Sequence, residues 1–99
     1  MVIRRTRLSP ARMDVRKQFG RTLRGLRDAR KLTQEELAYQ AGVDVTYLSD
    51  LERGKWNASL AVLVDLARAL AVHPSELLKD IKVTPGDNPA PKRKRMDRR

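Results

Sequence analysis

The stretch LTQEELAYQAGVDVTYLSDLERG, residues 32–54, contains two helix-start signals separated by a turn glycine. The first start is Thr33, because Thr33 and Glu36 have the T-x-x-E spacing in which a hydroxyl and a carboxylate satisfy each other's free backbone amides. Gly42 is the C-terminal stop, since a residue without a β-carbon adopts the left-handed conformation at little cost. Asp44 is the next N-cap. The stretch therefore predicts two short helices in succession.

The second of these helices runs from Asp44 to Gly54 and has one apolar face. That face is formed by residues at helical spacing, together with one just before the cap: Val43, Leu48 and Leu51. The other faces are left with Val45, Thr46, Ser49 and Asp50. Two short helices joined by about four residues around a glycine match the helix-turn-helix, whose second helix reads base edges in the major groove of DNA.

The chain from about residue 23 to residue 78 resembles the lambda-repressor-like (Xre/Cro) family. The resemblance is carried by LRGLRDARKLTQEELAYQAGV, by YLSDLERGKWNASLAVLVDLARAL and by HPSELL, and its most diagnostic part runs from LTQEELA to LERG. It covers a little over half of the chain. The resemblance implies an all-α, compact five-helix domain that binds operator DNA as a symmetric dimer.

A first helix is predicted to start at Ser9, with Pro10 in the first helical position, and to run to about Arg30. Asp14 is a rival start. The predicted buried stripe of this helix is Val15, Phe19, Leu23 and Leu26. Two glycines interrupt it, each costing about 1 kcal/mol relative to Ala in a helix interior: Gly20 and Gly25.

After the motif, Ser59 is predicted to cap a fourth helix with leucines at helical spacing, and Pro74 to begin a fifth. The fourth carries Leu60, Leu63, Leu66, Ala67 and Leu70, and the fifth Leu77, Leu78 and Ile81. No strand or repeat is expected. The predicted core consists of Leu23, Leu26, Leu37, Ala38, Ala41, Val43, Leu48, Leu51, Leu63, Leu66, Leu70 and Leu77.

Three parts are predicted: a basic arm at 1–8, a DNA-binding domain at 9–83 with its motif at about 33–53, and a basic disordered tail at 84–99. Residues 1–31 hold 11 Lys and Arg against 2 Asp and Glu, the centre is slightly acidic, and 84–99 hold 6 against 2. Flexible basic termini on an acidic centre are expected to attract phosphates from the flanks.

Composition restricts the class of protein further. A chain of 99 residues suits one domain, and zero Cys removes disulfides and thiolate metal sites, as in a reducing cytosol. No apolar run reaches the ~20 residues of a membrane span, and the N-terminus lacks a signal-peptide stretch. We expect a cytoplasmic protein that has no membrane partner, no cofactor and no metal.

The family pattern implies which residues contact bases: Val45, Thr46 and Asp50. Val45 would pack on a thymine methyl, Thr46 would donate or accept, and Asp50 would accept from cytosine N4. Backbone contacts are implied for Gln34, Tyr47, Arg53, Lys55 and Asn57. The family pattern also implies that Gln34 braces the recognition helix, and the alternative is an exposed helical glutamine. For Tyr47, packing on the domain is the alternative. The role of Trp56 stays open between the sugar-phosphate edge and a dimer interface.

Arg27 and Glu52 occupy positions that form an ion pair in similar proteins, joining the first helix to the end of the recognition helix. The alternative is two exposed charges worth ~0–1 kcal/mol. Three arginines of the N-terminal arm resemble those that enter a minor groove, although the arm could equally be a disordered basic leader: Arg4, Arg5 and Arg7.

An enzyme is not expected. The only His, His73, precedes Pro74 where a helix cap belongs, and the chain has no phosphate-cradling loop, nucleophile motif or metal-ligand cluster. We predict a sequence-specific transcriptional regulator, a repressor or autoregulator, that binds a palindromic operator in double-stranded DNA as a homodimer. The rival is an antitoxin or adaptor whose main partner is a protein, such as a toxin or another regulator.

Overall fold

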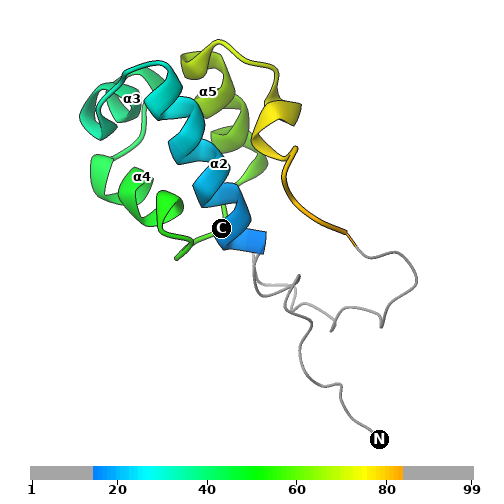
Figure 1. Cartoon of the computed structure of the whole chain (residues 1–99). Coiled ribbons are helices and arrows are strands. Elements are labelled where there is room, and N and C mark those ends of the chain that lie inside the picture. Colours follow the sequence, from blue (N-terminus) through cyan, green and yellow to red (C-terminus); the bar gives the residue numbers. More distant parts are fainter. Residues whose placement is uncertain (1–14, 84–99) are drawn as a thin grey trace, which may run out of the picture.

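The computed structural model describes residues 15–83, which form four α-helices and one short 3-10 helix (Figure 1). The elements are α2 (Val15–Ala29), α3 (Gln34–Ala41), α4 (Val45–Glu52), α5 (Leu60–Leu70) and η1 (Pro74–Leu77). No strand occurs in this part of the chain, as predicted. The arm, the tail and the proposed first-helix starts at Ser9 and Asp14 lie outside the described residues.

The prediction of a fifth α-helix from Pro74 is wrong, because the chain forms a 3-10 turn there. Its hydrogen bonds span three residues, from the Glu76 amide to the His73 carbonyl (2.9 Å) and from the Leu78 amide to the Ser75 carbonyl (3.0 Å). The start was placed correctly, with His73 as N-cap. One turn is enough to bury Leu77, and it leaves Leu78 45% exposed.

The predicted caps of the motif are present. The Thr33 hydroxyl accepts from the Glu36 amide (3.0 Å), while the Glu36 carboxylate accepts from the Thr33 amide (2.8 Å). Gly42 ends α3 in the left-handed conformation, with φ 75°. The Asp44 carboxylate then caps α4 by accepting from the amides of Thr46 and Tyr47. These local bonds fix where both helices of the motif begin.

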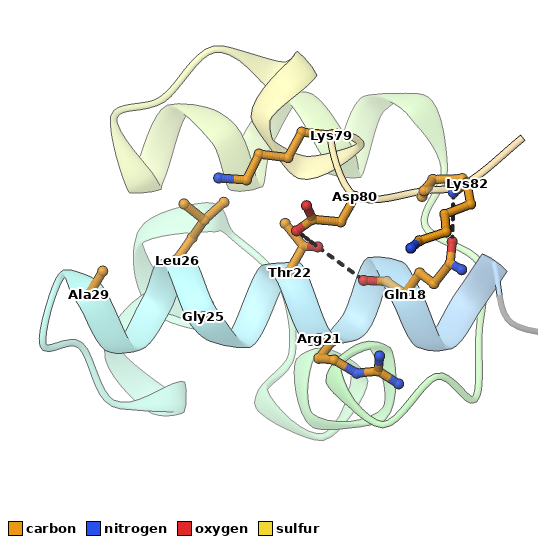
Figure 2. Close-up of a pocket in the computed structure, with 10 residues that line it drawn as sticks. Gln18, Arg21, Thr22, Gly25, Leu26, Ala29, Lys79, Asp80 and Lys82 are labelled. Carbon is orange, nitrogen blue, oxygen red and sulfur yellow. Dashed lines mark hydrogen bonds between the residues drawn. The ribbon is translucent and has the colours of Figure 1, made fainter.

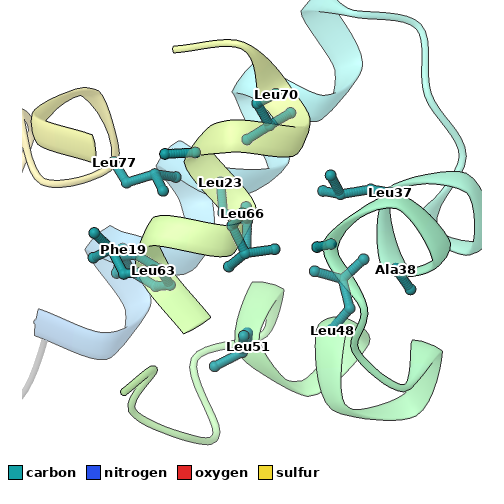
Figure 3. Packing of buried hydrophobic residues seen from close by; sticks show 12 residues of the cluster. Phe19, Leu23, Leu37, Ala38, Leu48, Leu51, Leu63, Leu66, Leu70 and Leu77 are labelled. Carbon is teal, nitrogen blue, oxygen red and sulfur yellow. The ribbon is translucent and has the colours of Figure 1, made fainter. Parts of the chain in front are cut away.

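A leucine-rich core lies where α2, α3, α4 and α5 meet, and η1 closes it with Leu77 (Figure 3). Ten of the predicted core residues are buried, whereas Leu26 and Val43 pack only partly against the cluster. Phe19 and Ala67 belong to the buried cluster as well. Leu60, predicted in the α5 stripe, is the first residue of that helix and is 79% exposed.

Gly20 lies at a close approach of α2 and α4. A β-carbon at this position would lie 2.5 Å from the carbonyl oxygens of both Leu51 and Glu52, which only a glycine avoids. Gly25, on the same helix, is exposed and has nothing within 4 Å of such an atom. Gly20 thus lowers the helix propensity of α2, as predicted, but its missing side chain is what allows α4 to pack against α2.

Candidate nucleic-acid interface

The helices α3 and α4 form the helix-turn-helix, joined by residues 42–44. α4 packs against α2 and α3 through the fully buried Leu48 and Leu51. On its other sides, Thr46 is exposed, and Val45 and Ser49 are half-buried. The two leucines hold the inner face of α4, and Val45 also packs partly against the core, so Thr46 is the most exposed of these three residues.

A buried ion pair holds the end of α4 against α2. Arg27 donates from Nε to Glu52 Oε2 (2.6 Å) and from Nη2 to Glu52 Oε1 (3.0 Å). The side chains are 11% and 4% exposed, so the alternative of two surface charges does not describe this pair. The hydrogen bond to Glu52 raises the pKa of Arg27 above its usual value, against the opposing effect of burial.

Gln34 joins the same carboxylate from the start of α3, since its side-chain amide donates to Glu52 Oε1 (2.9 Å). Arg27 also donates to the Leu32 carbonyl just before α3 (2.9 Å). One carboxylate therefore connects α2, α3 and α4. Gln34 supplies the bracing contact implied by the family pattern, and its side chain is half-buried at the edge of the motif.

Asp50 has hydrogen bonds at both carboxylate oxygens. Oδ1 accepts from Arg53 Nη2 (3.0 Å) and lies 3.8 Å from Lys55 Nζ, and Oδ2 accepts from the Trp56 indole (3.2 Å). The indole bond is the main reason that the pKa of Asp50 is lowered, and Arg53 and Lys55 lower it further. The carboxylate thus faces the loop after α4.

The loop after α4 carries the remaining predicted backbone contacts. The side chains of Arg53 and Lys55 are 63% and 57% exposed, and Asn57 is also exposed. Tyr47 is half-buried and packs against the core. Arg16 of α2 donates to the Lys55 carbonyl (3.1 Å), a contact that no sequence pattern indicated because 39 residues separate the two.

The remaining positions singled out in the sequence are the three arm arginines and His73. Arg4, Arg5 and Arg7 fall outside the described residues. His73 Nδ1 accepts from the Ser75 amide (3.0 Å), which is a capping bond. Within residues 15–83, no three His, Cys, Asp or Glu side chains are grouped to hold a metal, and none of the helices is long and apolar enough to cross a bilayer.

An open groove of about 700 Å³ runs along α2, on the side where the chain after η1 returns (Figure 2). The Thr22 hydroxyl donates to Asp80 Oδ2 (3.0 Å), and the Lys82 amide donates to Gln18 Oε1 (3.0 Å). The lining comes from α2 and residues 79–82 and includes nothing from α3 or α4. The groove is therefore separate from the helix-turn-helix.

Comparisons with known proteins agree with this geometry. The uncharacterized HTH-type transcriptional regulator y4dJ of Sinorhizobium fredii is 42% identical over 73 residues, which are 74% of this chain and 95% of the relative. The control protein C.BamHI of Bacillus amyloliquefaciens is 38% identical over 66 residues, covering 66% of this chain and 82% of that protein.

Among solved structures, the restriction-modification controller protein C.AhdI from Aeromonas hydrophila superimposes with a TM-score of 0.62 at 45% identity. The match covers 63% of this chain and 94% of the controller. The model of the family described as "Helix-turn-helix domain" matches residues 18–79, from α2 to just beyond η1. With the motif, its caps and the buried brace in place, this chain belongs to the helix-turn-helix domain family, in its lambda-repressor-like (Xre/Cro) form.

Proposed function

We propose that this chain is a sequence-specific transcriptional regulator, a repressor or autoregulator, that binds a palindromic DNA operator as a homodimer. The observation that carries the proposal is the way α4 is held, with one face buried in the domain and the other at the surface. Its inner face is fully buried, its C-terminal end is braced by the Arg27–Glu52 pair, and Thr46 is exposed near its N-terminus. The relatives named as transcriptional regulators and controller proteins support it.

The proposal assigns base reading to the N-terminal part of α4, as is usual for a recognition helix. Thr46 is exposed and Val45 half-buried, so a hydroxyl and part of an apolar side chain are available to base edges. Asp50, the third predicted reader, already accepts hydrogen bonds at both oxygens. Reading cytosine N4 would require it to share or give up those bonds, so we assign it no base.

Contacts to the DNA backbone are assigned to the residues around α4 that carry donors. They position the protein without reading sequence: Gln34, Tyr47, Arg53, Lys55 and Asn57. The three arm arginines are assigned to the adjacent minor groove, where they would add affinity. In this role the protein acts in the cytoplasm, where bacterial operators lie.

Selection of bound duplexes from a random-sequence pool tests the function directly, using the full chain. We expect enrichment of a palindrome whose half-sites are about one helical turn, ~34–36 Å, apart, because each subunit of a dimer inserts one recognition helix. Recovery of a single half-site would mean that the protein binds as a monomer, which would contradict the proposed homodimer. A pool that stays random after repeated rounds would exclude sequence-specific binding.

A further inference from the structure

Trp56 is the only tryptophan of the chain, and it lies in the loop that follows α4, with 53% of its surface exposed. The one polar group of its side chain, the indole N–H, already donates to Asp50 Oδ2 at 3.2 Å. An indole nitrogen donates only, so the exposed part of Trp56 is hydrocarbon ring. Trp56 thus presents an apolar aromatic surface to whatever binds at this end of α4.

The position of the ring is fixed by Asp50 and by the backbone of the loop. The Asp50 side chain is only 16% exposed and also accepts from Arg53. The Lys55 amide donates to the Asp50 carbonyl (2.9 Å), and the Lys55 carbonyl accepts from Arg16 of α2 (3.1 Å). Trp56 therefore shares one carboxylate with two exposed cations, Arg53 and Lys55.

We propose that Asp50 is a positioning residue that holds Trp56 so that the exposed ring packs against the deoxyribose edge of bound DNA. The proposal rests on the proposed function. The deoxyribose edge of a DNA strand is apolar and is flanked by phosphates, which matches a ring flanked by two cations. A second copy of the chain fits this surface less well, because a two-fold axis at Trp56 would bring Arg53 and Lys55 of both copies together.

The single tryptophan makes the proposal measurable. We would titrate the full chain with a labelled random-sequence duplex at low salt, following Trp56 emission and label anisotropy together. Emission should shift to shorter wavelength as the duplex binds, because the ring leaves water. Asp50→Ala should weaken binding to every duplex roughly 2- to 10-fold. This loss corresponds to the entropic cost of immobilising one or two side chains at the interface when DNA binds.

Further variants separate positioning from charge. Asp50→Ala should shift the emission of the free protein to longer wavelength, and Asp50→Ala/Trp56→Ala should bind no more weakly than Trp56→Ala alone, because both changes disable the same contact. Trp56→Phe, which keeps a ring, should lose less affinity than Trp56→Ala. The control is Glu35→Gln, which removes an equal charge from exposed α3 surface and should not weaken binding. Asp50→Leu, whose side chain cannot accept a hydrogen bond, repeats the test if the alanine variant unfolds in a thermal melt.

Five results would overturn the proposal. Tighter binding of the Asp50 variants to all duplexes would mean that the carboxylate only repels phosphate. An altered preference at one base pair would make Asp50 a reader. Unchanged Trp56 emission while the label reports binding would exclude the ring contact. A shift of Trp56 emission on concentrating the protein without DNA would also exclude it, because the ring would then be buried between two copies of the chain. If the label reports no binding by the unsubstituted chain, the proposed function fails first, and this inference fails with it.

Discussion

Gly20 and Gly25 lie on the same helix, and we expect alanine to have opposite effects on stability at the two positions. In a helix interior, Gly→Ala is favourable by about 1 kcal/mol. At Gly25 nothing lies within 4 Å of the added atom, so the full gain is expected. For a domain of this size, 1 kcal/mol corresponds to a Tm increase of about 4–8 °C.

At Gly20 the added atom would lie 2.5 Å from two carbonyl oxygens of α4, at Leu51 and Glu52. Overpacking costs typically ~1–3 kcal/mol, and the upper end applies here because the obstacle is backbone. After subtracting the helix gain of about 1 kcal/mol, the net loss is about 2 kcal/mol. The corresponding decrease in Tm is about 8–16 °C.

The assay is thermal unfolding followed by circular dichroism, with the two variants measured side by side in one buffer. The two substitutions are chemically identical and lie on the same helix. Gly25→Ala therefore controls for the change in helix propensity and for effects on the unfolded chain. A Gly20→Ala variant that melts at or above the temperature of the unsubstituted protein would refute the close approach of α2 and α4. A decrease in Tm for both variants would refute the open space at Gly25.

Four further predictions concern the ion pair of Glu52, the proposed DNA contacts and the carboxylate of Asp50. Glu52→Gln should lower the free energy of unfolding by ~3–5 kcal/mol in denaturant titrations, since it leaves Arg27 buried without its partner; a loss below ~1 kcal/mol would indicate a surface pair. Thr46→Ala should lose ~0.5–1.5 kcal/mol of discrimination at one base pair of the selected operator, the value of one hydroxyl hydrogen bond, and equal losses on all sequences would contradict base reading. Affinity for DNA should fall ~10³- to 10⁵-fold between 50 and 200 mM salt if some 6–10 phosphates are neutralised, so a shallow slope would reject backbone-dominated binding. Because the folded-state pKa of Asp50 lies below the ordinary 3.8, its bonds stabilise the fold above that pH and are lost as the pH falls through the folded value; Trp56 emission should report this acid step, and a step that persists in Asp50→Asn would belong to another group.

The motif was predictable because its signals are local. Thr33, Asp44 and Ser59 each cap a helix through bonds to amides two or three residues ahead, so a short stretch of sequence specifies the start. The leucine periodicity likewise identified the buried faces. The start at Pro74 was found as well, but a few residues of pattern cannot distinguish one 3-10 turn from an α-helix.

What could not be predicted depends on residues far apart in the chain. The need for glycine at position 20 arises only once α4 lies against α2, and the Arg16 bond to the Lys55 carbonyl joins the same two regions. The bond between Asp50 and Trp56 spans a loop whose course no periodicity describes. The sequence shows which side chains are present, but which atoms they contact depends on tertiary packing.

The single carboxylate of Glu52, shared by three helices, has a consequence for how the proposed regulator would acquire new specificities. That carboxylate and the inner leucines hold α4 against the domain, whereas Thr46 is exposed. A new side chain at position 46 would therefore change the proposed operator preference at little cost in stability. Duplicated copies of the protein, or variants made in the laboratory, would then diverge in specificity and keep the same fold.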